Sequence, residues 1–408
     1  MNFRKTLRAT VAGLFTVLSA ASMSADNKLV NSEWNEVEQQ AAGQTVYFNA
    51  WGGDNRTNDY INWLAAEVKR QFDIELVHVK LSDTAEAVSR VLAEKQAGNT
   101  NRGAVDLVWI NGENFASMKQ AGLLYGPWAE DVPNFPLTNP DESPAVRTDF
   151  TVPVDGYELP WGKAQLVFYY DKALTENPPK TIPQLLKWSK SNKGEFSYAK
   201  PPQFLGTTFL KQALIELAED SSVLSEPVSE ADFEAVTKPL WRFLDELHPQ
   251  LWRSGRAFPE SGPAMRQLMA DGELSLAYSF NTQEAAGAIA ANELPASVET
   301  YVLDGGTLGN FSFVGIPFNA SHPAGAMVVA NFMLSPEAQA RKQDATVWGN
   351  STVLSLEKLT EQQRALFEKL PQLPGAASTA ELEKVIAEPH PSWVEALEQA
   401  WLKRYVGS

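Results

Sequence analysis

Short apolar runs alternate with longer segments of helical spacing along the first third of the chain. Residues 45–50, 74–79 and 106–110 are largely apolar runs of strand length, and each predicts a buried strand. Residues 57–72 and 83–97 lie between these runs and carry apolar positions at three- and four-residue steps, which predicts helices with one buried face. Strands and helices that alternate in this way predict a parallel sheet covered by helices.

The alternation breaks off and then resumes further along the chain. Residues 125–160 are rich in proline and acidic residues and lack helical periodicity, so we expect irregular surface structure that leads to a crossover. A predicted strand at residues 164–170 then precedes a helix that begins near Pro183, and a second α/β unit is expected from here. Its further elements are predicted as helices near residues 207–218, 230–247 and 261–270, strands at residues 273–280, 300–303 and 311–316, and a mostly helical segment over residues 323–405.

The N-terminus has the layout of a secretory signal peptide. Arg4, Lys5 and Arg8 form a positive region ahead of an apolar stretch at residues 9–21, and small residues follow it. The alternative, a membrane anchor, needs roughly 20 apolar residues, and this stretch is shorter. We therefore expect residues 1–24 to be cleaved and the mature protein to be exported to the periplasm.

Composition sets the number of cores and excludes several kinds of chemistry. The 408 residues include no cysteine, which excludes disulfides, thiolate metal sites and a cysteine nucleophile. With 44% hydrophobic residues and 12 Trp, the chain can fill two cores, and single cores seldom grow beyond roughly 250–300 residues. The formal net charge of −16 disfavours nucleic acid and anionic lipid surfaces as partners.

Three sets of residues, in chain order, resemble one protein family. They are residues 106–113 (DLVWINGE) with AGLL at 121–124, FYYDKA at 168–173 with NPPKTIP at 177–183, and GIPFNA at 315–320 with residues 326–339. Over roughly residues 45–345 the chain is thereby similar to bacterial extracellular solute-binding proteins of ABC importers, the group with maltose-, spermidine- and iron-binding members. It also resembles a subgroup of these proteins whose ligand is not settled, so the resemblance does not carry a ligand identity.

The resemblance implies an α/β fold of two discontinuous lobes joined by a hinge, as in type II periplasmic binding proteins. On this basis we expect residues 25–160 and 300–340 in one lobe and residues 161–299 and 341–408 in the other, with the ligand in the cleft between them. Trp161 lies at the first crossing between the lobes, where it would be part of the hinge and also of the cleft wall. The implied partners are a small solute and the permease and ATPase subunits of the importer, and we expect a monomer without a cofactor.

Candidate ligand contacts follow from the rule that open parallel sheets bind ligands beyond the carboxyl ends of their strands. In the first lobe the candidates are Trp51, Gly52, Gly53, Asp54, Asn111 and Glu113. Gly52 and Gly53 would let a ligand approach the backbone, and the loop with Asn111 and Glu113 offers amide and carboxylate groups together. The alternatives are an ordinary glycine turn beneath a core Trp and a helix N-cap.

The second lobe and the later loops supply further candidates, namely Gly206, Thr207, Tyr278, Asn281, Asn310 and Trp348. The first two open a helix, whose free amides and hydroxyls can hold a ligand oxygen or simply be capped. Aromatic faces near Asp54 and Glu113 would suit a cation. Against this, most Trp side chains in a large protein belong to its cores, so the sequence favours a cationic solute only modestly.

Two other functions remain open at this stage. A secreted hydrolase using paired carboxylates has no supporting motif: the four His match no metal-ligand spacing, no G-x-S-x-G is present, and residues 305–309 match neither a Walker loop nor G-x-G-x-x-G. We therefore expect no catalytic or metal-binding residues. A ligand-binding sensor module would use the same fold, and neighbouring genes for a permease and ATPase or for a receptor would distinguish it from an importer.

Overall fold

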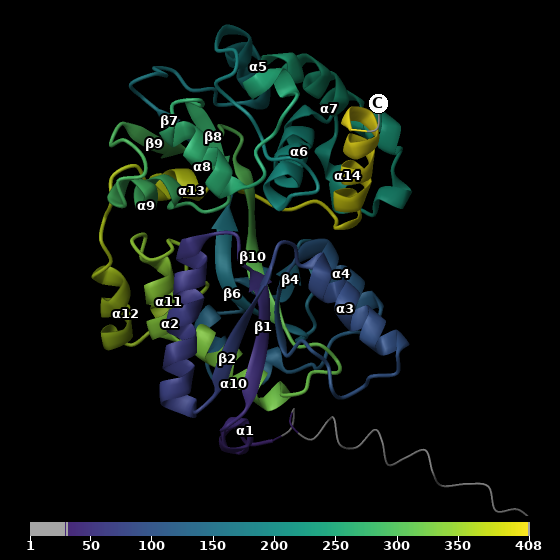
Figure 1. The fold of residues 1–408 in the computed structure, drawn as a ribbon, viewed down its shortest axis with the longest axis vertical. Coiled ribbons are helices and arrows are strands. Elements are labelled where there is room, and N and C mark those ends of the chain that lie inside the picture. The colour runs from purple at the N-terminus through teal and green to yellow at the C-terminus, as the bar shows by residue number, and fades with distance from the viewer. Residues whose placement is uncertain (1–28, 30–31, 407–408) are drawn as a thin grey trace, which may run out of the picture.

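The computed structural model describes residue 29 and residues 32–406, and the predicted signal peptide at residues 1–24 lies outside them. The described chain forms two α/β lobes, one above the other in Figure 1. None of the helices in this part of the chain combines the length and the apolar character needed to cross a membrane.

The lower lobe is built on a mixed sheet. The strand order is β11 (Val385–Ile386), β10 (Thr307–Gly315), β3 (Leu107–Ile110), β1 (Thr45–Trp51) and β2 (Glu75–Leu81), with β6 (Glu158–Gln165) also paired to β10. The short strand β11 pairs only with the first residues of β10, at the end of the sheet that reaches the upper lobe. The strand β1 pairs in parallel with β2 and β3, as the alternation predicted, whereas β10 runs antiparallel to β3. The helices of this lobe are α1 (Trp34–Ala41), α2 (Asn55–Phe72), α3 (Ala85–Gln96), α4 (Gly112–Gln120), α10 (Pro323–Met333), α11 (Pro336–Gln343) and α12 (Glu361–Glu368).

The helix α2 illustrates how the local sequence positions the edge of the sheet. Asp54 precedes the helix and accepts a hydrogen bond from the backbone amide of Arg56, which satisfies one of the free donors of the first turn. The helix ends at Asp73, whose φ of 55° is left-handed. Between these ends the apolar stripe of α2 is completely buried, so the start of the helix is fixed at the carboxyl end of β1.

The upper lobe has a smaller sheet, which is antiparallel. Its order is β8 (Leu276–Ser279), β7 (Val167–Asp171) and β9 (Val298–Tyr301). Around it lie α5 (Ile182–Ser191), α6 (Phe204–Leu217), α7 (Phe233–Leu247), α8 (Gly262–Ala270), α9 (Glu284–Ala290), α13 (Thr379–Leu382) and α14 (Ser392–Tyr405). The predicted irregular segment before β6 holds three short 3-10 turns and a small hairpin of β4 (Thr148–Asp149) and β5 (Val152–Pro153).

Three segments connect the lobes. The strands β6 and β10 pair with each other along the whole join, from Glu158 opposite Gly315 to Gln165 opposite Gly309, and the register shifts between Ser312 and Phe313. The third connection is the chain between α12 and α13 (Figure 1). Each lobe is therefore discontinuous in sequence, as the resemblance implied.

The lobe boundaries differ from the expected ones at two places. Residues 341–408 were expected in the second lobe, yet Trp348, Val353 and Phe367 pack in the lower core, because α11 continues from α10 and α12 packs against α11. Only the chain after the third crossing reaches the upper core. Residues 300–308, expected in the first lobe, contribute Tyr301 and Leu308 to the upper core, because β10 crosses the join only after its first residues.

Candidate functional site

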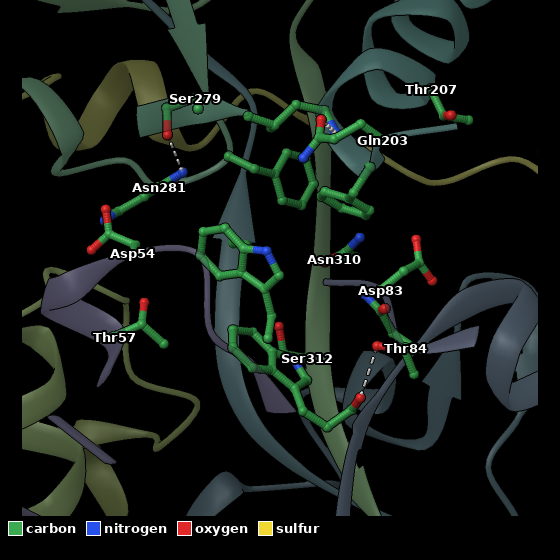
Figure 2. Close-up of a pocket in the computed structure, with 18 of the residues that line it drawn as sticks. Asp54, Thr57, Asp83, Thr84, Gln203, Thr207, Ser279, Asn281, Asn310 and Ser312 are labelled. Atoms are coloured by element: carbon green, nitrogen blue, oxygen red, sulfur yellow. Dashed lines mark hydrogen bonds between the residues drawn. The ribbon is translucent and has the colours of Figure 1, made fainter. Parts of the chain in front are cut away.

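A cavity of about 260 Å³ lies between the two lobes, and residues of both lobes line it (Figure 2). From the lower lobe, the loops after β1 and β2 and the end of β3 reach the cavity, which is the edge where open α/β sheets bind ligands. From the upper lobe, the starts of α6, α8 and α9 and one face of α14 line it, and β10 crosses between. This volume lies just below the ~300–1,000 Å³ typical of small-molecule pockets, so a small solute is expected.

Eight of the residues predicted from the sequence lie together in the lining of this cavity. They are Trp51, Asp54, Asn111, Glu113, Thr207, Asn281, Asn310 and Trp348. Five other predicted contacts lie outside the lining: Gly52, Gly53, Trp161, Gly206 and Tyr278.

The two aromatic residues outside the lining have structural roles. Trp161 is fully buried, and its ring meets that of Trp109 edge-on at 5.0 Å, so it lies behind the cavity wall rather than in it. The hydroxyl of Tyr278 accepts a hydrogen bond from the amide of Ala199 and donates one to the carbonyl of Leu205. Tyr278 thus anchors the start of α6 from inside the upper core.

The three glycines outside the lining allow close packing. A Cβ atom at Gly53 would lie 2.6 Å from the indole of Trp51, and one at Gly206 would lie 2.2 Å from the carbonyl oxygen of Ala199. A Cβ atom at Gly52 would meet a lysine side chain of β2. These glycines therefore allow the backbone behind the cavity lining to pack closely against neighbouring residues.

Sequence reasoning missed several lining residues, namely Ser82, Asp83, Thr84, Trp109, Gln203, Lys211, Glu284, Ser312 and Glu398. The loop with Ser82, Asp83 and Thr84 follows β2, so the same strand-end rule would have found it. Nothing local to α14 identifies Glu398, because its place in the cavity depends on how the lobes meet.

The helices α2, α4, α6 and α8 all begin at the cavity, and a side chain of this chain accepts a hydrogen bond from the first turn of each. The caps are Asp54 Oδ1 to α2 at 2.7 Å, Asp149 Oδ2 to α4 at 2.6 Å, Gln203 Oε1 to α6 at 2.8 Å and Ser261 Oγ to α8 at 3.2 Å. Free helix N-termini attract anions. Here at least one amide of each start is already engaged, and carboxylates engage it at α2 and α4.

One end of the cavity carries carboxylates without a cationic partner. Glu398 Oε1 accepts a hydrogen bond from Thr207 Oγ1 at 2.6 Å, and Glu113 Oε1 accepts one from Asn114 Nδ2 at 3.0 Å. Burial raises the pKa of both glutamates to about 7. Within the described residues neither these two nor the nearby Asp83 forms an ion pair with a Lys or Arg, because Lys211 is engaged elsewhere, 2.6 Å from a carboxylate oxygen of Glu388.

The opposite end carries a set of ion-paired side chains that joins the lobes, which we call the cross-lobe ion cluster. Its three carboxylates and two guanidinium groups are Asp54 and Arg56 from the lower lobe and Arg266, Glu284 and Glu293 from the upper. Arg266 bonds Glu284, reaches Glu293 at 3.0 Å and lies 3.5 Å from Asp54. Arg56 bonds the same oxygen of Glu293 at 2.8 Å. Asp54 and Glu284 therefore each have a guanidinium partner before any ligand binds, although the three carboxylates of the cluster outnumber its two arginines.

Comparison with known proteins identifies the family. Residues 63–356 match the family model described as bacterial extracellular solute-binding protein. The chain is also 46% identical over 394 residues to Protein YnjB of Escherichia coli strain K12, a match that covers 96% of this chain and 97% of that protein. The chain belongs to the bacterial extracellular solute-binding protein family. The resemblance seen in the sequence is thus confirmed.

Solved structures agree on the fold of this solute-binding protein. A putative spermidine/putrescine ABC transporter from Listeria monocytogenes is 17% identical with a TM-score of 0.64, over 89% of this chain and 98% of that one. The periplasmic binding protein AfuA from Actinobacillus pleuropneumoniae, with fructose-6-phosphate bound, is 15% identical with a TM-score of 0.63, over 90% and 99%. The two-lobed α/β architecture is shared, although the solutes named for these two proteins differ in the sign of their charge.

Contacts outside the ion cluster also hold the lobes of the solute-binding protein together around the cavity. The side-chain amide of Asn281 donates to the carbonyl of Trp348 at 2.9 Å across the join. At Gly287 an added Cβ atom would lie 2.8 Å from the guanidinium of Arg56, and at Gly349 one would lie 2.5 Å from Gln283. Backbone from each lobe thus contacts the other directly.

We expect the change Arg266→Gln to open the lobes, since Arg266 bonds residues of both lobes without lining the cavity. Cross-lobe ion pairs of this kind contribute about 1 kcal/mol, so the closed-to-open ratio should fall roughly fivefold. Small-angle X-ray scattering should record a larger radius of gyration for the variant. The control Arg253→Gln removes the same charge from the exposed surface of the same lobe. Equal radii for the two variants would refute the role of Arg266.

Proposed function

We propose that this protein is the solute-binding component of an ABC importer, which captures a small organic cation in the periplasm and delivers it to a membrane permease. The observation that carries the proposal is the cavity lined by both lobes and by β10, in a chain of the extracellular solute-binding family. A ligand that contacts both lobes stabilises the closed form because it makes these contacts only there. The structural similarity to a putative spermidine/putrescine ABC transporter supports a role in import.

The charges around the cavity support a cation rather than an anion. The helix N-termini that would attract an anion are capped by the protein's own side chains, and Lys211 is paired with Glu388. Glu113 and Glu398 have no cationic partner in the described part of the chain. Aromatic faces on the same walls, including Trp109 and Trp348 with rings 5.7 Å apart, suit an organic cation.

We further propose that the protein has no enzymatic activity of its own, works without a cofactor and acts as a monomer, with ATP hydrolysis in separate subunits. A binding protein needs only affinity and a closed shape. Adjacent genes for a permease and an ATPase would support import, and an adjacent receptor gene would instead favour the sensor reading.

Calorimetry on the mature protein tests this function directly. The protein is unfolded and refolded to remove any retained solute and is then titrated with spermidine, thiamine, maltose and inorganic phosphate. Heat of binding with one of the two cations is expected. Binding of maltose or phosphate, with neither cation bound, would overturn the cationic assignment. Mass spectrometry of the solute retained on purification gives an independent answer.

The change Trp51→Ala should weaken binding of the cation identified in this way by roughly tenfold, about 1.4 kcal/mol, because the indole lines the cavity wall beside Asp54. The control is Trp63→Ala, an indole of α2 that is also partly buried but does not line the cavity. Calorimetry on both variants checks the prediction. If the two variants bind equally well, Trp51 is not a ligand contact.

A further inference from the structure

We propose that Glu398 determines the selectivity for cations: with Glu113 on the opposite lobe it forms a pair of carboxylates across the cleft, and the lobes close fully only when a cation or a proton compensates the pair. The inference rests on the proposed function and identifies the side chain that makes the affinity depend on the charge of the solute. Glu398 lies beyond residues 63–356, the part of the chain that matches the family model.

The helix α14 holds Glu398 in the cleft by the packing of its other face. Trp393, Leu397 and Trp401 are spaced four residues apart and are buried in the upper core. Val394 and Glu398, also four residues apart, form the adjacent face and line the cavity. Because the core residues fix the rotation of the helix, Glu398 cannot turn away from the cleft without unpacking α14.

The opposite lobe presents Glu113 to the same space. The helix α14 packs against α4, on whose first turn Glu113 lies. The amide of Gly112 donates to Asp149 and not to Glu113, whose carboxylate has only its own backbone amide as a main-chain donor. Closing the cleft therefore brings two carboxylates from different lobes into one poorly solvated space, which is unfavourable while both are ionised.

The groups that face this pair leave its charge uncompensated. Asp83, in the loop before α3, adds a third negative charge. Lys211 on α6 is the nearest cation, but its ammonium lies 2.6 Å from Glu388, and the two side chains are 2% and 1% exposed. Thr207 gives Glu398 a hydrogen bond but no charge.

Neutral acceptors on β10 provide independent evidence for a ligand in the cavity that the pair lines. The side chain of Ser312 is 6% exposed and lines the cavity, yet it makes no hydrogen bond within the described residues, and Figure 2 shows it between the lobes. Asn310 Oδ1 is buried and has no partner among these residues either. Both can accept hydrogen bonds from the N–H groups of a cationic solute, as the carboxylates can.

The direction of the pH effect follows from closure. In the structure, burial raises the pKa of each glutamate to about 7. Opening the cleft would expose both side chains to water and bring their pKa values back toward the ordinary range of a glutamate. Closure without solute therefore takes up protons at pH values between the ordinary pKa of a glutamate and the raised pKa of about 7. The closed fraction should accordingly rise as the pH falls through 7. A cation that binds between the carboxylates competes with those protons, so its affinity should fall over the same range.

The experiment measures closure without any solute. Since the chain has no cysteine, the changes Arg90→Cys on α3 and Lys238→Cys on α7 give two unique sites for spin labels, one on each lobe. Electron paramagnetic resonance distances then report the closed fraction of the refolded, solute-free protein at pH 5.5 and pH 8. We expect a larger closed fraction at pH 5.5 in the parent protein.

The variant Glu398→Gln should be largely closed at pH 8 and should lose most of the pH dependence of closure. Glu113→Gln should do the same from the other lobe. The matched control is Glu395→Gln, which removes the same charge from the exposed face of α14 and should behave as the parent.

The same variants test the affinity for the solute. In calorimetry with spermidine and with thiamine, Glu398→Gln should lower the affinity for the bound cation at least tenfold, and Glu395→Gln should not. The inference is overturned if both glutamine variants match the control in closed fraction and pH dependence. Failure of the proposed function would appear separately, as absence of cation binding by the unchanged protein.

Discussion

Replacing Glu388 by glutamine should lower the free energy of unfolding by about 3–5 kcal/mol, the typical cost of removing one partner from a buried ion pair. The ammonium of Lys211 lies 2.6 Å from Glu388, and both side chains are almost completely buried. Glu388 also accepts a hydrogen bond from Asn310 on β10. Without the carboxylate, the buried charge of Lys211 loses its ion-pair partner, and the faces of Phe150 and Phe204 near it cannot replace that partner. Urea unfolding of the parent and the variant measures the difference.

The double variant Lys211→Met with Glu388→Leu should recover most of the lost stability, because no unpaired charge is then buried. The control is the exposed pair of Lys190 and Glu246, where Glu246→Gln should change the free energy of unfolding by less than about 1 kcal/mol. A single variant as stable as this control, or a double variant no better than the single, would contradict the prediction.

Replacing Trp161 by alanine should also cost about 3–5 kcal/mol of stability, the usual range for a large buried aromatic residue. Its ring is fully buried and lies 6.1 Å from Phe48, 5.0 Å from Trp109 and 5.5 Å from Trp348. The side-chain amide of Gln339 also donates to its carbonyl at 2.8 Å, so the residue joins β6 to α11. The cavity left by alanine would sit at the first crossing between the lobes.

Trp161→Phe supplies the control, since it keeps an aromatic ring in the core and should lose distinctly less stability. Denaturant unfolding of both variants, with calorimetry under native conditions, separates stability from binding. Because Trp161 does not line the cavity, we expect the stability loss to dominate for alanine. Weaker binding with unchanged stability would show instead that Trp161 acts as a cleft wall.

Trp161 also shows why some sequence predictions succeed and others do not. The strand β6 is buried on both faces, so the alternation that usually tells core from surface is absent, and an aromatic residue there fits either a core or a binding wall. On β1, by contrast, the strand ends at Trp51 and a capped helix follows at once. The strand-end rule then places Trp51 and Asp54 at the cavity from sequence alone.

Features that depend on contacts between the lobes could not be predicted from the chain. The four-residue spacing of Trp393, Leu397 and Trp401 predicts the buried face of α14. Only the docking of the lobes, however, places Glu398 opposite Glu113. The same holds for the boundary after residue 341, because helical periodicity shows that a face is buried but not which core buries it.

The paired strands β6 and β10 also restrict how the two halves can separate. A ribbon of two hydrogen-bonded strands resists shear in its own plane and flexes across it, and the register shift between Ser312 and Phe313 marks where the ladder is weakest. The third connection, between α12 and α13, lies to one side of this ribbon (Figure 1). We therefore expect the lobes to open by rotation about a single hinge axis set by this ribbon. The cavity would then open to solvent on the same side of the molecule each time.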